Sequence, residues 1–351
     1  MVSIPEKKSI QQVSDLLGVW LKVPKDEVRV ESGMDDRQID GFVHAGNFKF
    51  MVASKANGNA AQIISAIQSL NKSEQNFEGP VIPLLAVPFM GDVGRKLCEE
   101  AGVSWLDLSG NANIFTPNLR ILIDGRPNRF KSPGRPSNAF APKSSRIARW
   151  LLMHADQSMS QREIAQTTNM DEGFTSRIVS RLEADGLVAR SKDGLIRVSD
   201  PDLLLDSWQE RYSFSNHQII KGHIAARSSD ELLKKIPSLF SENKVPHSAT
   251  GLGAAWLYNK FSGFRIVTFY LQFSPAPELF DLIGFREDPR GANIWLVVPN
   301  DEGVFQGAAE VESIQCVHPV QAYLDLLGHP ERAKEAAERL RQELLKWGKD
   351  A

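Results

Sequence analysis

The residues whose types and spacing best suit a chemical role lie between Asp171 and Gly186. Laid out as an α-helix at about 100° per residue, this segment gathers on one side the residues that must be buried, namely Thr175, Ile178, Val179 and Leu182. The opposite side carries small or hydrogen-bonding residues and two arginines, namely Gly173, Ser176, Arg177, Ser180 and Arg181. Because small residues permit close approach and arginine donates to guanine or phosphate, this surface suits a helix that enters the major groove of DNA.

Two further helices are expected before this one. Residues 145–155 have a helical pattern with an apolar face. Ser160 and Glu163 have the form of a capping box, which predicts a second helix over residues 161–168. Asp171 then suits the N-cap of the third helix, because its carboxylate can accept from an unpaired amide of the first turn.

A basic hairpin is expected after the third helix. Gly186 suits the C′ position, and strands at 187–190 and 195–198 flank an Asp-Gly turn that is typical of a hairpin. Three helices and such a hairpin predict a winged helix-turn-helix. We expect it to contact double-stranded DNA, with base-reading, wing and backbone-anchoring contacts from Lys143, Arg146, Gln161, Arg162, Gly173, Ser176, Arg177, Ser180, Arg181, Arg190, Lys192 and Arg197.

The charge distribution favours DNA contact over the alternatives. The whole chain has a formal net charge of −2, so any nucleic-acid contact must be local. From Gly125 to Trp150 there are seven cations and no acid, whereas an isolated charge run is usually a solvated linker. A winged helix can also serve as a protein-docking module. Here the basic run leads directly into the first helix and cations recur on the third helix and hairpin, which favours DNA.

The first third of the chain resembles the PD-(D/E)XK restriction-endonuclease fold, over roughly residues 10–125. Its predicted helices and strands alternate in the corresponding order, and one strand ends in Met51-Val52-Ala53-Ser54-Lys55. The resemblance implies two carboxylates on a divalent metal and a lysine that polarises water. Lys55 matches the lysine and Asp40 could supply the first acid, but Ala53 stands at the second acid position. We therefore expect a degenerate, non-catalytic domain without metal; the alternative is a nuclease with an atypical site.

That atypical nuclease would use Asp35, Asp36 or Asp40. Residues 105–113 form the most distinctive patch of the same domain, a strand that leads into a Gly-Asn turn. Asp107 or Ser109 could hydrogen-bond this loop, which is the structural interpretation that we favour. The functional alternative is a loop that faces a ligand or DNA.

The combination of motifs in the rest of the chain resembles the AbiEi family of antitoxins and transcriptional regulators. The matching segments are residues 144–149, 171–177, 200–208, 250–255 and 318–326. The resemblance implies repression of the protein's own promoter and, for some members, opposition to a nucleotidyltransferase-like toxin. In contrast to those antitoxins, the winged helix lies mid-chain. The C-terminal domain also resembles a minimal nucleotidyltransferase fold, but residues 265–269 lack the Asp-x-Asp pair that would hold its metals, so no transfer chemistry is expected.

Composition supports an α/β multidomain protein of 351 residues. We expect a degenerate nuclease-like domain (1–128), a basic Pro-rich linker (129–142), a winged helix (143–212) and an α+β antitoxin-like domain (213–351). The longest apolar stretch, residues 81–90, is too short to span a bilayer, and Cys98 and Cys316 are expected as buried thiols of a reducing cytoplasm. We expect a homodimer, a protein partner such as a toxin, no cofactor and no enzymatic activity.

Overall fold

The computed structural model describes residues 6–32, 39–130, 138–261 and 263–347. The chain divides into two compact units, which we call unit 1 (Met1–Pro136 with Glu183–Leu187) and unit 2 (Ser137–Leu182 with Val188–Ala351). Most of the winged-helix segment and the C-terminal half lie in unit 2, and the domains expected at 143–212 and 213–351 stay predictions. Half of the predicted linker, residues 131–137 with Lys131 and Arg135, lies outside the described residues.

Unit 1 is built on a seven-stranded mixed sheet whose strands follow one another in chain order. The central strands β3, β4 and β5 are parallel, and antiparallel pairs flank them on both sides. The strands are β1 (Arg29–Ser32), β2 (Gly41–Ala45), β3 (Phe48–Ser54), β4 (Ile82–Val87), β5 (Ser104–Asp107), β6 (Ala112–Thr116) and β7 (Leu119–Ile123). The sequence pattern predicts strands at residues 27–32, 41–44, 48–53, 81–87, 105–108 and 119–123, which correspond to all of these strands except β6.

Helices cover both faces of this sheet. The alternation of a strand sends Phe50 and Val52 to the core beneath α1 (Glu6–Leu21), and Met51 and Ala53 to the core beneath α2 (Ala60–Gln75) and α3 (Asp92–Glu100). A short 3-10 helix, η1 (Lys25–Glu27), connects α1 to β1. Ala53 is fully buried, so β3 carries ordinary core residues at this position, as expected.

The loop after β5 is organised by one buried carboxylate. Asp107 is fully buried and accepts from the Met90 amide (3.1 Å), the Asn111 amide (2.9 Å) and the Asn111 side chain (2.8 Å). The Ser109 hydroxyl donates to the carbonyl of Pro88 at 3.2 Å. These contacts support the structural interpretation of the loop, because its polar side chains form hydrogen bonds within the protein.

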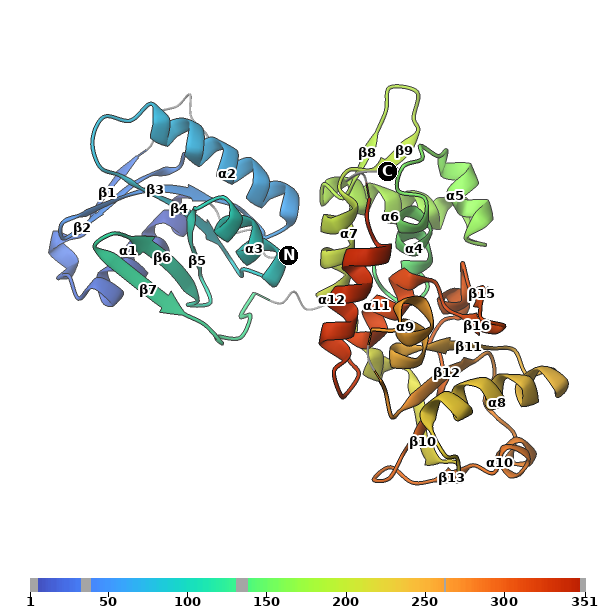
Figure 1. Cartoon of the computed structure of the whole chain (residues 1–351). Helices are drawn as coiled ribbons and strands as arrows, with labels where there is room; N and C mark the ends of the chain where they lie inside the picture. The colour runs from blue at the N-terminus through green and yellow to red at the C-terminus, as the bar shows by residue number, and fades with distance from the viewer. Residues whose placement is uncertain (1–5, 33–38, 131–137, 262, 348–351) are drawn as a thin grey trace. The chain divides into compact units, whose positions relative to one another are not determined.

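The winged helix forms one end of unit 2 (Figure 1). Its helices and strands are α4 (Ser145–Met153), α5 (Gln161–Thr167), α6 (Glu172–Ala184), β8 (Val188–Arg190) and β9 (Ile196–Val198). The helix α7 (Pro201–Gln209) follows, with the Asp200 carboxylate as its N-cap. All of these elements were predicted, with ends that differ by a few residues.

The other end of unit 2 is a second seven-stranded mixed sheet, in the order β13-β10-β14-β12-β11-β16-β15. The strands are β10 (Gln218–His223), β11 (His247–Thr250), β12 (Val267–Leu271), β13 (Arg286–Glu287), β14 (Ile294–Val298), β15 (Ala309–Val311) and β16 (Ile314–Cys316). The helices are α8 (Ser229–Glu242), α9 (Gly251–Asn259), α10 (Pro277–Ile283), α11 (Pro319–Leu326) and α12 (Ala333–Leu344), with the 3-10 helices η2 (Phe214–Asn216) and η3 (Glu302–Phe305).

The two faces of this sheet differ in chemistry. On one face, Val267, Phe269 and Leu271 of β12 pack in an apolar core with residues of α8. On the other face, Thr268 hydrogen-bonds His329 at 2.8 Å and Tyr270 donates to Asp325 of α11 at 3.0 Å. A buried polar layer therefore separates the sheet from α11, and polar groups in such a layer require hydrogen-bond partners.

Some C-terminal expectations need revision. The pattern of residues 330–347 predicts a terminal helix with Ala336, Leu340 and Leu344 along one buried stripe. Ala336 and Leu340 are buried, but Leu344 is 42% exposed. Gly253 approaches Leu233 so closely that a Cβ would lie 3.2 Å from it, which favours helix packing over a phosphate cradle. Both cysteines are free and buried, and burial raises the pKa of each thiol to about 12. The nuclease-like and nucleotidyltransferase-like resemblances stay predictions.

The buried Asp107 provides a test of unit 1. We expect Asp107→Ala to lower the unfolding free energy of unit 1 by about 2–4 kcal/mol, because buried donors lose a charged acceptor. Urea titration of the full chain, followed by hydrogen exchange on peptides from residues 80–130, measures this loss. Asp26→Ala, at an exposed position, is the control and should change stability by less than about 0.5 kcal/mol. Equal values for the two variants would contradict the structural role.

Candidate nucleic-acid interface

The helix α6 has the two faces that its sequence predicts. Thr175, Ile178, Val179 and Leu182 are its buried residues. Gly173, Arg177 and Ser180 are exposed, and Ser176 and Arg181 are half-buried. The Arg177 guanidinium lies 5.8 Å from the ring centre of Phe174 on the same helix. The structure thus brings the five residues proposed for groove contact onto one side of one helix, backed by a rigid apolar stripe.

Side-chain caps fix where the helices of the winged helix begin. The Glu163 amide donates to the Ser160 hydroxyl at 3.1 Å, and the Phe174 amide donates to the Asp171 carboxylate at 2.9 Å. Gly186 has a left-handed backbone with φ 74°, the conformation that ends a helix at a C′ glycine. The predicted caps at Ser160, Asp171 and Gly186 are therefore confirmed.

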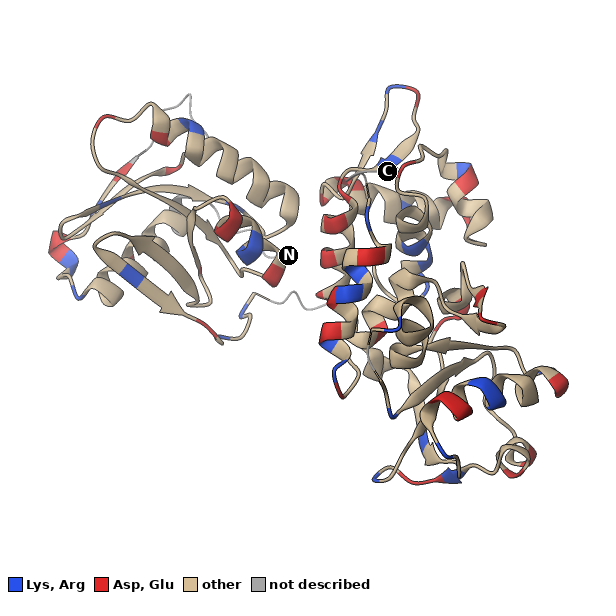
Figure 2. Ribbon diagram, in the orientation of Figure 1, with Lys and Arg blue, Asp and Glu red and all other residues tan. Residues whose placement is uncertain are grey.

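The wing is a short antiparallel hairpin with exposed cations. β8 pairs with β9, and Met159 forms an additional bridge to Ile196, so the segment between α4 and α5 is fixed to the wing. Arg190, Lys192 and Arg197 are all exposed. Figure 2 shows these basic positions along the hairpin that projects from unit 2. A projecting hairpin with exposed cations is suited to phosphate or minor-groove contact.

The helix α5 and the amino end of α4 carry fewer exposed cations than α6 and the wing. Lys143 is exposed, and Gln161 is half-buried at the start of α5. Arg162 is exposed and lies 3.8 Å from the Glu172 carboxylate at the start of α6. This weak surface pair leaves the Arg162 side chain in solvent, where such pairs contribute little to stability.

Arg146 is not available at this surface, contrary to our expectation. Its guanidinium makes a two-pronged contact with the Asp301 carboxylate, with both N–O distances 2.7 Å, and a third contact of 3.2 Å with Glu302. The paired side chains of Arg146 and Asp301 are only 13% and 12% exposed. Hydrogen bonding to Asp301 raises the pKa of Arg146 further. Arg146 therefore connects α4 to η3 rather than to a DNA backbone.

A second arginine of α4, which the sequence did not single out, is buried at the same junction. Arg149 is 2% exposed and donates to the Gln321 side chain of α11 at 2.5 Å. Its guanidinium also lies 5.0 Å from the ring centre of Trp208 on α7. Burial lowers the pKa of Arg149 to about 10, so it still carries a proton at neutral pH. The signal that could have revealed it is an arginine at a position of α4 that faces the core.

Two carboxylates, Asp301 and then the fully buried Asp325, favour the charged form of Arg149 through their own charge. Gln321 accepts from Arg149 and donates to Asp325 at 2.7 Å, so its side-chain amide bridges the guanidinium and the carboxylate. Asp325 also accepts from Thr250 and from Tyr212 and Tyr270. Burial raises the pKa of Asp325 to about 6, although these hydrogen bonds oppose the rise. This network joins α4, α7, β11, β12 and α11 into one body.

The carboxyl end of β3 in unit 1 was the candidate nuclease site. The Asp40 carboxylate accepts from the Ser54 amide, so it lies beside the residue that precedes Lys55. Ala53 is buried beneath α2 and offers no ligand. Asp35 and Asp36 lie outside the described residues. Among the residues that the structure describes, no group of three or more His, Cys, Asp or Glu could hold a metal ion.

Comparison with known proteins identifies the winged helix. A family model described as MarR family matches residues 141–195, which span α4 to the tip of the wing. The match supports a DNA-binding regulator with a winged helix-turn-helix. No curated protein and no solved structure matches the chain. Within the described part of the chain, no helix is long and apolar enough to cross a bilayer.

Buried histidines near the network predict a pH dependence. Burial lowers the pKa of His217, His318 and His329 to about 4, whereas unfolded histidine titrates near 6.5. Between these values the unfolded chain binds more protons, so acidification favours unfolding. Asp325 acts in the opposite direction between about pH 6 and 4, because its native pKa is raised, but three histidines outweigh one carboxylate.

We therefore expect the unfolding free energy of unit 2 to be highest above pH 6.5 and to fall by about 2 kcal/mol or more on acidification to pH 4.5. Urea titrations across this range, followed by hydrogen exchange on peptides from residues 210–330, measure the change. His329→Gln should make the unfolding free energy depend less on pH, because it removes one of the three histidines whose pKa is lowered by burial. A stability that does not change, or that increases on acidification, would contradict the assignment.

Proposed function

We propose that this protein is a non-enzymatic transcriptional regulator that binds specific double-stranded DNA through its winged helix. The observation that carries the proposal is the exposed face of α6, where small residues surround Arg177 on a helix with a fully buried opposite stripe. Such a face can approach base edges closely while arginine donates to guanine. The match of residues 141–195 to the MarR family model supports the same assignment.

The proposed DNA surface consists of α6, the wing and the amino ends of α4 and α5. Its members are Lys143, Gln161, Arg162, Gly173, Ser176, Arg177, Ser180, Arg181, Arg190, Lys192 and Arg197. Arg146 is left out, because it is paired with Asp301 and Glu302. We propose that the protein acts as a homodimer on paired half-sites, since two recognition helices multiply affinity and specificity.

A more specific role, an autorepressing antitoxin with a toxin partner, rests on the resemblance of residues 250–255 and 318–326 to AbiEi proteins. In this chain Thr250, Gln321 and Asp325 from those segments face the internal network, so they support the scaffold rather than a partner surface. The test is affinity purification of the tagged protein expressed together with the product of the adjacent gene. A stoichiometric complex would support the antitoxin role, and separate elution would oppose it.

Substitution of Arg177 tests the regulator proposal. Duplexes that the protein selects from a randomised pool provide the target, and fluorescence anisotropy measures binding. We expect Arg177→Ala to cost about 1–3 kcal/mol on the selected duplex and to relax base preference. Lys143→Ala should weaken selected and random duplexes alike. Arg286→Ala, on β13 at the opposite end of unit 2, is the matched control and should bind normally.

The same measurement can reject the proposal. Failure of the pool to yield any preferred sequence, with Arg177→Ala and Lys143→Ala equally weak on all duplexes, would leave only a phosphate-binding module. Affinity should also fall steeply with salt, because cations released from phosphates accompany each lysine or arginine contact. Binding that is insensitive to salt would contradict a contact through the wing cations.

The alternative function is a metal-dependent nuclease with an atypical site at Asp40. We expect no cleavage when supercoiled plasmid is incubated with the protein and Mg²⁺ or Mn²⁺, because hard cations require several oxygen ligands and Ala53 supplies none. Agarose electrophoresis measures nicking and linearisation. Cleavage that Asp40→Ala abolishes and Asp26→Ala retains would overturn the non-enzymatic assignment.

A further inference from the structure

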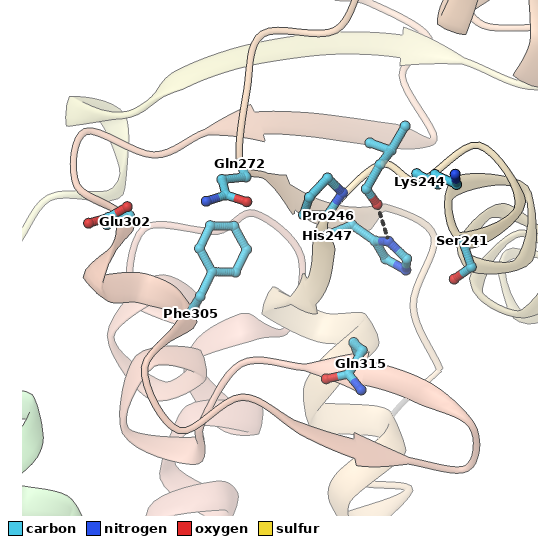
Figure 3. Close-up of a pocket in the computed structure, with 9 residues that line it drawn as sticks. Ser241, Lys244, Pro246, His247, Gln272, Glu302, Phe305 and Gln315 are labelled. Atoms are coloured by element: carbon cyan, nitrogen blue, oxygen red, sulfur yellow. Dashed lines mark hydrogen bonds between the residues drawn. The ribbon is translucent and has the colours of Figure 1, made fainter. Parts of the chain in front are cut away.

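A cavity of about 560 Å³ opens at one end of the C-terminal sheet, away from the proposed DNA surface residues. Its walls come from the end of α8, the start of β11, the end of β12, the strand β16 and the 3-10 helix η3 (Figure 3). This volume lies within the range of small-molecule sites, which are about 300–1,000 Å³. All of these elements belong to unit 2 and all lining residues are described.

The middle of the cavity is lined by flat and apolar groups. Phe305 points into it from η3, opposite Pro246, and His247 lies beside them (Figure 3). The Phe305 ring is held by an edge contact with Tyr270, with ring centres 6.2 Å apart. The His247 ring packs 5.1 Å from Phe240. A planar ring of a ligand could stack in this gap, as aromatic groups do at offset or edge geometries.

The rim supplies polar side chains that are not hydrogen-bonded to other described residues. Among the described residues, the side chains of Lys244, Gln272 and Gln315 make no hydrogen bond or ion pair. The Nδ1 atom of His247 lies 2.9 Å from the Val245 carbonyl oxygen, so Nδ1 carries the proton of a neutral ring and Nε2 is an acceptor. Burial lowers the pKa of His247, which keeps this tautomer neutral. The rim thus offers one cation, two amides and one acceptor.

One cation of the rim is available to an anionic group. Glu302 also lines the cavity, and it shares Arg146 with Asp301, at 3.2 Å from the guanidinium. Lys244 makes no ion pair among the described residues, so its ammonium group can pair with an anionic group of a ligand. An ammonium group of this kind binds carboxylate or phosphate.

The same 3-10 helix connects the cavity to the winged helix. Glu302 and Phe305 of η3 form one wall, and the adjacent Asp301 caps η3 through the Gly303 amide at 2.7 Å. Asp301 and Glu302 together hold Arg146 of α4. A ligand that contacts Phe305 and alters the position of η3 must also alter the support of α4, because the ion pair joins them directly.

We propose that this cavity is an effector site that binds a small molecule consisting of a flat ring and an anionic group, and that its occupation changes DNA affinity through η3 and Arg146. The ring lies between Phe305 and Pro246, its edge meets Gln272 and Gln315, and the anionic group pairs with Lys244. A nucleotide and an aromatic carboxylate both have this chemistry. The change in DNA affinity rests on the proposed regulator function, whereas the binding of ligand does not.

Calorimetric titration of the full-length protein with AMP, and separately with 2-aminobenzoate, tests the site without DNA. We expect at least one to bind with a Kd below about 1 mM. Lys244→Met and Phe305→Leu should each weaken that binding about tenfold, through loss of the charge and of the flat ring. Lys22→Met is the matched control, because Lys22 is also exposed and has the same left-handed backbone (φ 55° at both).

The outcomes are distinct. Binding of AMP alone assigns the nucleotide, and binding of 2-aminobenzoate alone assigns the aromatic acid. No binding of either, or binding that survives both Lys244→Met and Phe305→Leu, overturns the site. Thermal unfolding of each variant distinguishes a lost contact from a lost fold, and Phe305→Leu retains an apolar side chain against Tyr270 for that reason.

Anisotropy with the selected duplex tests the coupling. Saturating ligand should change the DNA Kd of the wild type at least about threefold, and Arg146→Lys, which keeps the charge but loses the two-pronged contact, should reduce that change. Ligand binding with an unchanged DNA Kd overturns the coupling. Ligand binding by a protein that selects no DNA sequence would reject the regulator function and leave the ligand site standing.

Discussion

The burial of a charged arginine between the winged helix and the C-terminal sheet constrains the rest of unit 2. Arg149 is almost completely removed from water, and removal of an ion from water costs several kcal/mol unless partners answer it. Gln321 of α11 accepts from one nitrogen of Arg149 and donates to Asp325, whereas Nε and Nη1 of Arg149 are buried without a hydrogen-bond partner. The charges of Asp301 and Asp325 favour the protonated form of Arg149. Separation of α4 from α11 would break the hydrogen bond between Arg149 and Gln321, so this contact favours keeping the two helices together.

This fixation divides the basic residues of the winged helix into two groups. Arg146 and Arg149 of α4 face inward and pair with Asp301, Glu302 and the Gln321–Asp325 bridge. Arg177 of α6 and the wing residues Arg190, Lys192 and Arg197 are exposed, and Arg181 of α6 is half-buried. The first helix therefore serves as the attachment of the winged helix to its own C-terminal half, while the third helix and wing carry the proposed contacts with DNA. A protein with a net charge of −2 can in this way present a local positive surface without general attraction to nucleic acid.

Unit 1 illustrates how a buried carboxylate can be structural. Asp107 accepts from the Met90 amide in the loop after β4 and from two donors of Asn111 in its own loop, and the half-buried Asp40 accepts from the amide of Ser54. Sequence periodicity located the strands and helices of this unit well, because each strand alternates between two cores and each helix has one apolar stripe. It missed β6, since Gly110, Asn111 and Asn113 have the composition of a turn. The pairing of β6 with β5 and β7 is a long-range arrangement that no local pattern contains.

The sequence by itself determined the winged helix. Its caps, its apolar stripe and its Asp-Gly turn act within a few residues of one another, so local physical chemistry specifies α5, α6 and the wing and places Arg177 outward. Only the tertiary structure decided which cations are exposed. Arg146 and Lys143 are alike in the sequence, and what separates them is Asp301, a carboxylate 155 positions away that the fold brings within 2.7 Å. Contacts between residues so distant along the chain depend on the packing of whole helices and strands. The pattern of charges along the sequence therefore does not reveal them.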